Sequence, residues 1–578
     1  MKLKIFIAAP VIALLTFIAA SQIKTKPFAP AEDLPREALI YVQIADLPTF
    51  IKLLNESEIS EKYAESTNFA DFQNGHLGIK LASRWQEFNA AAGFPIDLET
   101  AAQLANNQAA IGIYDIGKIE FVFVAPVSDE IFAATRFIQN KNNFTEATLA
   151  DGTTVYRATV EADRGRQAQE LLFTNADGRF ILATSEKLLT QTLDNIKGGQ
   201  AKNRLIDEPA FKILSEKFTP RTATVWVNQT ALNSDYYFKH YWLMSKPETL
   251  KNIRAGIFGF EIEEGKLIES RRFLLNENVA ATPISMAQAR ATLALLPENI
   301  PFYNLRKARV ETVNEAIEQT IFEPRTENEI GKRENYYAPD EGYTSENYET
   351  LGEKFDANIN DVEDAETNRQ QTANADFATS FQSAVPNAAL TFGAPKILPA
   401  PRFAEFRRAA VFNLAAPENF NRTAFESAVE RNLAARVLVS SPEIKLNWET
   451  KNENNLSWRE LDLPMLGQTV DYAIRGGEMI LTNDADFLRE ILAAGEKKSE
   501  LASEKPFAEL TVINLDQREE AFDQVFEQLG DETPASGFFT GNISSLLDSI
   551  SEVERIEIRK NYSANIMEEE LIFVLRSN

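Results

Sequence analysis

The fold is decided by one stretch of sequence, Glu170-Leu171-Leu172-Phe173-Thr174, Asn175-Ala176-Asp177-Gly178 and Phe180-Ile181-Leu182-Ala183-Thr184. Two apolar runs flank a turn, and its Asp-Gly pair supplies the positive φ angles that a tight hairpin requires. The residues that follow, 185–196, have the periodicity of a helix. The same pattern recurs at 470–482, where Gly476-Gly477 forms the turn, and a second helix is predicted at about 484–494. The chain therefore contains this hairpin and helix twice.

Two further matches flank the hairpins in the same order. Upstream, Leu34-Pro35-Arg36-Glu37-Ala38-Leu39-Ile40-Tyr41 recurs as Leu296-Pro297-Glu298-Asn299-Ile300-Pro301-Phe302-Tyr303. Each phrase leads into a strand and then into a predicted helix, at about 47–54 and 310–322. Downstream, the strand at 222–227 and the terminal hairpin at 255–275 are repeated at 510–515 and 552–575.

Three ordered matches predict an internal duplication. We place copy one at residues 32–278 and copy two at residues 294–578. Hairpins outnumber strand–helix–strand crossovers, so each copy is predicted to be an antiparallel sheet packed with helices. The expected fold class is α+β, with two tandem copies of this unit.

The first residues are typical of a leader. Lys2 and Lys4 precede an uncharged apolar run at 5–20, which ends in the small residues Ala19, Ala20 and Ser21. This is the arrangement of a signal peptide, and the run is also close to the length of a membrane span. We therefore assign residues 1–25 to a signal peptide or an N-terminal membrane anchor. Both alternatives predict an exported protein, in the bacterial periplasm or on the outer face of the inner membrane.

Composition argues against several classes of function. The 578 residues include 85 acidic and 59 basic side chains, for a net charge of −26, with no cysteine and two histidines. This charge repels phosphate backbones, so we expect no nucleic-acid partner. A chain without cysteine has no thiolate nucleophile, no zinc–thiolate site and no lipid-modified cysteine. We expect no metal and no cofactor, and membrane contact only through the possible N-terminal anchor.

Residues 323–376 distinguish copy two from copy one. They are rich in Glu, Asp, Asn and Thr and have almost no aliphatic periodicity. Such a segment cannot bury enough apolar area to offset its chain entropy, so we predict an acidic disordered insertion. The alternative is an acidic segment that binds a cation or a basic partner, helped by its tyrosines, Tyr336, Tyr337, Tyr343 and Tyr348.

The leader, the two-copy layout and three local features resemble a known family. The features are the Leu-Pro opening, the sequence Ile44-Ala45-Asp46-Leu47-Pro48, and two strands at 110–114 and 119–124 around Asp115-Ile116-Gly117-Lys118. Together they are similar to the exported bacterial family DUF3352, over nearly the whole chain apart from the acidic insertion. The resemblance implies an exported protein of unknown function and assigns no catalytic or binding residue. Copy two has a comparable strand at 407–414 but no counterpart of the Asp115–Lys118 turn.

Common catalytic motifs are missing from the sequence. His76 and His240 are the only histidines, and we interpret both as surface or packing residues. No phosphate-binding loop and no Gly-x-Ser-x-Gly motif is present. The acidic run Glu568-Glu569-Glu570 is expected to be solvated charge. Three residues at predicted helix starts are interpreted as N-caps: Asp46, Ser185 and Asp484.

The densest aromatic cluster is the candidate ligand-binding site. It comprises Tyr236, Tyr237, Phe238, Tyr241 and Trp242. On a helix, the last three would share one face, which suits either core packing or a binding surface for a hydrophobic ligand.

Three functions stay open. The first is a non-enzymatic, exported cell-envelope protein that binds or scaffolds an envelope protein, using the surface between its two copies. The second is an envelope hydrolase that uses a pair of carboxylates, at least one of them with a raised pKa. The third is a protein that binds a lipid or another hydrophobic ligand beside residues 236–244.

Overall fold

The computed structural model describes most of the chain in two compact units. Unit 1 comprises Met1–Ala281 and Leu529–Asn578, and unit 2 comprises Thr282–Gln528. The described residues are 30–55, 58–104, 108–149, 151–160, 169–198, 203–219, 221–235, 238, 251–263, 265–279, 281–322, 377–396, 405–436, 446–453, 456–463, 468–493, 501–516 and 548–576. The leader at 1–25 and the segment at 323–376 lie outside them. Among the described residues, no helix combines the length and apolarity needed to span a membrane.

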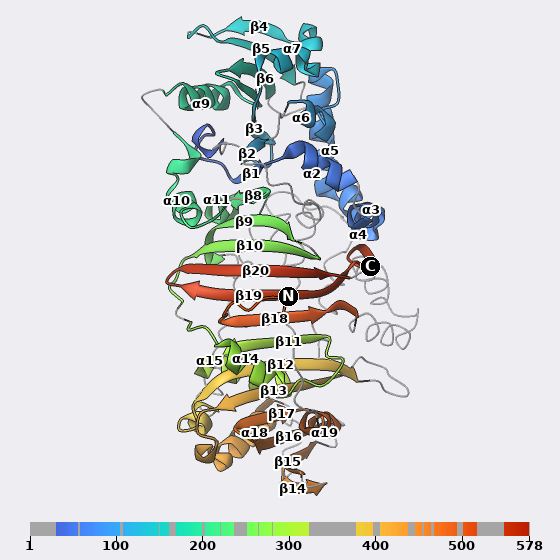
Figure 1. Ribbon diagram of the computed structural model, residues 1–578, viewed down its shortest axis with the longest axis vertical. Helices are drawn as coiled ribbons and strands as arrows, with labels where there is room; N and C mark the ends of the chain where they lie inside the picture. Colours follow the sequence, from blue (N-terminus) through green and yellow to red (C-terminus); the bar gives the residue numbers. More distant parts are fainter. Residues whose placement is uncertain are drawn as a thin grey trace, which may run out of the picture. The chain divides into compact units, whose positions relative to one another are not determined.

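Unit 1 is built on one antiparallel sheet, whose strands are visible in Figure 1. Pairing through this unit gives the order β4-β5-β6-β7-β3-β2-β1-β8-β9-β10-β20-β19. The strands are, in that order, β4 (Thr145–Thr148), β5 (Thr154–Val160), β6 (Gln169–Ala176), β7 (Arg179–Ala183), β3 (Glu120–Pro126), β2 (Ala109–Asp115), β1 (Ile40–Ile44), β8 (Ala223–Val227), β9 (Ile253–Glu263), β10 (Lys266–Leu275), β20 (Ile566–Leu575) and β19 (Val553–Ser563).

Unit 2 repeats most of this order. Its strands pair as β14-β15-β16-β17-β13-β12-β11-β18, all antiparallel. They are β14 (Trp448–Glu453), β15 (Leu456–Leu463), β16 (Gln468–Arg475), β17 (Glu478–Thr482), β13 (Glu405–Leu414), β12 (Pro386–Lys396), β11 (Phe302–Lys307) and β18 (Glu509–Asn514). Each of these strands has a counterpart among β1 to β8 of unit 1, in the same place in the sheet. The prediction of an α+β fold with two tandem antiparallel copies is confirmed.

The compact units do not coincide with the predicted copies. The last hairpin of copy two, β19–β20, belongs to unit 1, where β20 pairs with β10. The boundaries at 32–278 and 294–578 stay predictions. The segment at 323–376 falls between β11 and β12, a connection of 78 residues; the matching connection between β1 and β2 has 64. In copy one that connection holds four further helices after α2.

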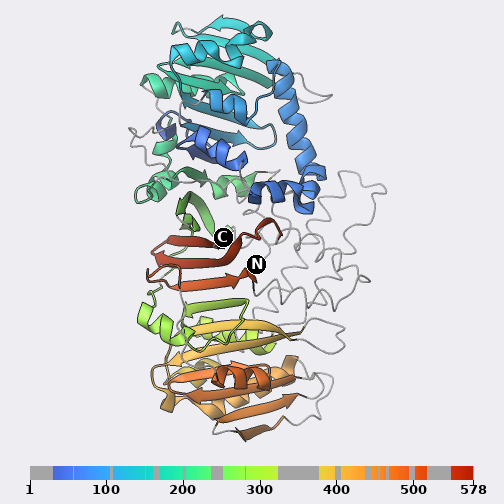
Figure 2. The ribbon, with the colours of Figure 1, turned by 45° about the vertical axis from the view of Figure 1, so that its right-hand side comes forward.

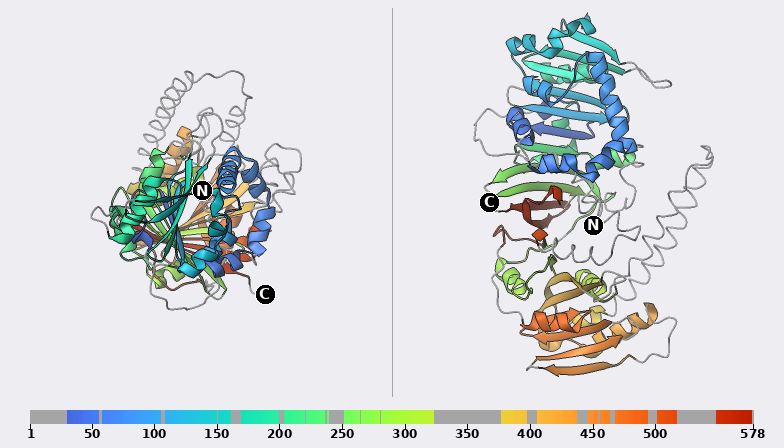
Figure 3. Two further views of the ribbon diagram at one scale, coloured as in Figure 1. Left: turned by 90° about the horizontal axis from the view of Figure 1, so that it is seen from above. Right: turned by 90° about the vertical axis from the view of Figure 1, so that its right-hand side faces the viewer.

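Helices lie on both faces of the unit 1 sheet. Their bounds are α2 (Leu47–Asn55), α3 (Glu58–Glu65), α4 (Thr67–Asn74), α5 (His76–Ala92), α6 (Leu98–Leu104), α7 (Asp129–Ala134), α8 (Arg136–Gln139), α9 (Glu186–Lys197), α10 (Pro209–Ser215) and α11 (Gln229–Ser234). Figures 2 and 3 show α2, α5 and α6 together on one side of the strands. In unit 2, the helices are α14 (Met286–Leu293), α15 (Val310–Ile317), α18 (Arg422–Arg436) and α19 (Ala485–Ala493).

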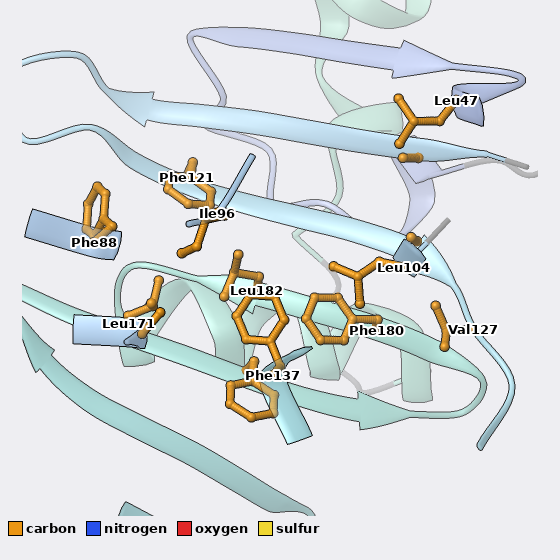
Figure 4. Packing of buried hydrophobic residues seen from close by; sticks show 14 of the residues in the cluster. Leu47, Phe88, Ile96, Leu104, Phe121, Val127, Phe137, Leu171, Phe180 and Leu182 are labelled. Carbon is orange, nitrogen blue, oxygen red and sulfur yellow. The ribbon is translucent and has the colours of Figure 1, made fainter. Parts of the chain in front are cut away.

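Alternation along the strands supplies two cores in unit 1. On β6, Leu171 and Phe173 join the cluster that includes Phe88 of α5, which Figure 4 shows, while Leu172 joins the cluster on the opposite face. Leu189 of α9 packs in that second cluster. Because side chains alternate with a period of two, a sheet covered on both faces must be apolar at successive positions, as β6 is.

The N-cap interpretation is confirmed for Ser185 and Asp484. Ser185 accepts a hydrogen bond from the backbone N–H of Leu188, at the start of α9. The Asp484 Oδ1 atom accepts one from the backbone N–H of Phe487 at 2.9 Å, at the start of α19. The equivalent helices of the two copies therefore begin with the same kind of cap, which satisfies a backbone donor that has no partner within the helix.

Replacing Ser185 by alanine is expected to lower the free energy of unfolding by about 1 kcal/mol, because the backbone N–H of Leu188 loses its acceptor. Chemical denaturation of the full chain would measure the change. Ser215→Ala is the control, since Ser215 is at the last position of α10, where its hydroxyl makes only a long hydrogen bond of 3.4 Å to the Lys212 carbonyl, and we expect a change within about 0.5 kcal/mol. Equal losses in the two variants would contradict the role of Ser185.

Candidate functional site

The predicted aromatic site lies largely outside the described residues. Tyr236, Tyr237, Tyr241 and Trp242 are all outside them, as is His240. Phe238 is described and buried, and its backbone N–H donates to Asp235 Oδ1 at 2.9 Å. The structure therefore places one member of the cluster, and whether the five form a binding site stays a prediction.

A turn that the family resemblance emphasised has a structural role. Asp115 Oδ1 accepts a hydrogen bond from the backbone N–H of Lys118 at 2.8 Å, which closes the turn between β2 and β3. The Gln169 side chain of β6 donates to the Lys118 carbonyl at 2.8 Å. These contacts explain the polar residues of the turn by local geometry. The corresponding connection of copy two, at 397–404, lies outside the described residues.

The most unusual chemistry in unit 1 lies where the two terminal hairpins pair. Strand β10 ends copy one and β20 ends copy two, and the two pair over nine residue positions. Strand β10 carries Lys266, Arg271 and Arg272, and β20 carries the run 568–570 of three glutamates. We call β10, β20 and β19, with their charged side chains, the charged seam.

One face of the charged seam holds a row of buried, alternating charges. Arg271 binds Glu269 with two hydrogen bonds, of 2.6 and 2.7 Å, and donates to Glu569 Oε2 at 3.0 Å. The Lys560 Nζ atom of β19 lies 3.8 Å from the other Glu569 oxygen. Glu269 and Glu569 are only 2% and 5% exposed. The row thus neutralises two buried carboxylates with two cations, as buried charge requires.

The opposite face carries a second set of ion pairs. Arg272 lies 3.2 Å from Glu568 and donates to the backbone carbonyl of Leu214, in α10, at 2.6 Å. On β19, the fully buried Glu557 is bound by Arg559 at 2.8 Å and by Arg555 at 3.3 Å. Charged residues on both faces therefore fasten the strands of the charged seam to one another and to α10.

The expectation that Glu568-Glu569-Glu570 is solvated charge is wrong for Glu569. Glu568 has a half-exposed side chain, but Glu569 is buried against Arg271. Successive residues of a strand point to opposite faces, so a charge run in a strand covered on both faces cannot be entirely solvated. Sequence reasoning missed this because the partner strand lies 298 residues away along the chain.

Burial and neighbouring charges shift the pKa values of Glu269 and Arg271 in this row. Burial raises the pKa of Glu269 above its ordinary value, although Arg271 opposes the rise. Burial also disfavours the charged form of Arg271, but Glu269 and Glu569 outweigh it, so the pKa of Arg271 is raised. The guanidinium therefore stays charged and holds both carboxylates.

Unit 2 contains a different buried carboxyl. Asp471 of β16 is fully buried, and Thr469 donates a hydrogen bond to its Oδ2 atom. Its Oδ1 atom makes no hydrogen bond of standard geometry to any residue that the structure describes. Burial, reinforced by the nearby Glu460 and Asp484, raises the pKa of Asp471 to about 7. At the equivalent position of copy one, β6 carries the buried Leu172.

A cavity of about 210 Å³ lies at the Leu-Pro opening of copy two, lined by residues that include Leu296, Tyr303 and Asn514. Small-molecule sites usually span roughly 300–1,000 Å³, so this cavity is small for an organic ligand. Asn514 already uses its side-chain amide to donate to the Ile300 carbonyl at 2.7 Å. Within the described ranges, no group of three or more His, Asp or Glu side chains is placed to hold a metal ion.

Comparisons with known proteins assign neither a family nor a function to the chain. No protein-family model matches the chain, and no curated protein matches it. Solved structures similar to it include crystal form III of TP0453, with 9% sequence identity and a TM-score of 0.24 over 48% of this chain and 89% of that chain. Crystal form I of TP0453 has 11% identity and a TM-score of 0.23 over 46% of this chain and 85% of that chain. Similarity at this level carries no inference about fold or function.

Proposed function

We propose that this chain is an exported cell-envelope protein that acts without catalysis, as a binding or scaffold protein built on two joined copies of one unit. The observation that carries the proposal is the charged seam, in which the last strands of the two copies pair along nine positions. Because β19 and β20 belong to the same compact unit as β10, these buried, mutually neutralised charges join the last hairpin of copy two to the sheet of copy one. Export is supported by the leader-like sequence at 1–25.

The hydrolase alternative needs a reactive carboxylate that substrate can reach. Asp471 has the raised pKa that a general acid or base needs. It is fully buried, however, and Glu460, which faces it across the β15–β16 pair, is bound by Lys451 at 3.4 Å. We therefore interpret Asp471 as a feature of the core. The hydrophobic-ligand alternative rests on residues 236–244, of which the structure describes only Phe238.

The proposal is tested by crosslinking in intact cells of the native host. A photoreactive amino acid would replace exposed apolar residues, Phe72 or Ile79 in unit 1 and Val385 or Phe406 in unit 2, one at a time. Crosslinked neighbours would be identified by mass spectrometry. A protease added after the outer envelope is opened would show whether the chain lies outside the cytoplasm, because only an exported chain would be cleaved. The matched control is the same amino acid at the buried Leu172, which should capture no neighbour.

We expect at least one exposed position to capture an envelope protein reproducibly, from a protease-accessible chain. A protease-protected, cytoplasmic chain would overturn export. An accessible chain that captures no neighbour from any of the four positions would overturn the binding role. Release of a small-molecule product by the purified chain would overturn the non-catalytic assignment.

A further inference from the structure

The pairing of β10 with β20 has two-fold symmetry. Lys266 and Ile566 each form the first pair after the turn of their own hairpin, so equivalent positions are 300 residues apart. Lys266 of β10 pairs with Val574 of β20. The residues equivalent to these two, Ile566 of β20 and Leu274 of β10, also pair with each other. Ser270 pairs with its own equivalent, Glu570, at the centre. Reciprocal pairing of this kind is the geometry of an isologous dimer interface.

The two strands nevertheless carry opposite charges at this symmetric interface. The described strand β10 has three basic residues and one acidic residue, for a charge of +2, and β20 has three acidic residues, for a charge of −3. The register sets Arg271 directly opposite Glu569 and Arg272 directly opposite Glu568. Opposite charges in directly paired positions stabilise a sheet, and like charges destabilise it.

The same symmetric register penalises pairing of like strands. Two β20 strands would bring six carboxylates together and set Glu570 against its own copy. Two β10 strands would set each Arg271 opposite a Glu269, but they would leave each Arg272 opposite Ile268 with no acidic partner, in a pair whose charge is +4. The unlike pair gives both Arg271 and Arg272 a directly opposite glutamate, and its total charge is −1.

We propose that the charged seam is a recognition interface. In it the basic strand β10 specifically pairs with the acidic β19–β20 hairpin of copy two and does not pair with a second β10 strand. Its partner is thus defined chemically as an antiparallel β-strand with consecutive glutamates in register with Arg271 and Arg272. This proposal does not depend on what the protein binds in the envelope. It assigns the specificity to side-chain charge, because the backbone pairing is symmetric and would accept either strand.

The test uses the full chain with a protease recognition sequence inserted between Ala281 and Thr282, in the connection that follows β10. After cleavage of the folded protein, size-exclusion chromatography and sedimentation would measure whether the two fragments stay together. The variants are Arg272→Glu, the reciprocal Glu568→Arg, and the combination of the two, since this pair lies on the opposite face from Glu269 and Lys560. Circular dichroism would check the fold of each variant.

We expect cleaved wild type to remain a 1:1 complex that weakens as salt is raised. Either single reversal should weaken association about 10-fold, and the double variant should restore most of it, because opposite charges again face each other. Equal association in all four proteins would overturn the proposal. If a single reversal does not fold, the double variant still decides: restored folding and association support charge recognition, and failure of the double variant overturns it.

Discussion

Replacing Arg271 by methionine should lower the free energy of unfolding by about 3–5 kcal/mol. The substitution removes the cation between two buried carboxylates, so Glu269 and Glu569 would be left close together in an environment with little water. Breaking a buried ion pair costs this much because the remaining charge keeps its desolvation penalty and loses its compensation. Chemical denaturation of the full chain, followed by tryptophan fluorescence, would measure the loss.

A matched control separates burial from charge. Arg157 also binds two glutamates, Glu170 and Glu186. The side chains of Arg157 and Glu170 are each about one-third exposed, and that of Glu186 is about half exposed. Arg157→Met should cost no more than about 1 kcal/mol, since exposed ion pairs contribute little. Replacing the whole row, Glu269, Arg271, Glu569 and Lys560, by methionine should recover much of the stability lost in the single variant. A loss below about 1 kcal/mol for Arg271→Met would contradict the account of the charged seam.

Replacing Asp471 by leucine should raise the free energy of unfolding at pH 8 by about 3–4 kcal/mol. Copy one shows that leucine fits this position of the sheet, since the equivalent Leu172 is fully buried. At pH 8 the aspartate is ionised and buried, with one oxygen that makes no standard hydrogen bond to a described residue. Removing that carboxyl removes its desolvation cost.

The effect should depend on pH with a definite sign. The pKa of Asp471 is about 7 in the folded chain and near 3.8 when unfolded, so the folded state holds its proton more tightly. The penalty from this residue is therefore absent below about pH 4, grows as the pH rises to 7, and is constant above 7. The difference in stability between Asp471→Asn and wild type should follow this curve. A difference independent of pH would contradict the raised pKa.

The reciprocal substitution provides the control. Leu172→Asp places a carboxyl at the equivalent position of unit 1, where wild type has none. We expect a loss of about 3 kcal/mol or more at pH 8, and a smaller loss at pH 5, for the same reason of burial. A Leu172→Asp protein as stable as wild type at pH 8 would show that this side of the sheet tolerates charge, and would remove the basis of both predictions.

Local features were predictable because their causes lie within a few residues. The hairpin around Asp177-Gly178 forms as expected, since both residues have positive φ angles that the tight turn requires. Ser185 and Asp484 cap their helices because a backbone donor lies three residues ahead of each. The repeated order of such features also predicted the duplication, which the matching strand orders of the two units display.

The candidate site was predictable only in part. The sequence pointed to residues 236–242, and four of those five aromatic residues lie outside the described part of the chain. It gave no reason to select Arg271, Glu569 or Asp471, because each is an ordinary charged residue in an acidic chain. Asp471 follows Thr469-Val470 in β16, whose pattern resembles that of β6 in copy one. Only the comparison with the buried Leu172 of β6 shows that Asp471 places a carboxyl at a core position.

The sequence by itself determined the α+β class, the hairpins and the existence of two copies, since periodicity and turn chemistry act over short distances. Only the tertiary structure decided that β10 pairs with β20 and that Glu569 is buried between Arg271 and Lys560. The physical reason is that burial and charge compensation depend on which strands meet. Arg271 and Glu569 are 298 residues apart, and no local pattern records that distance.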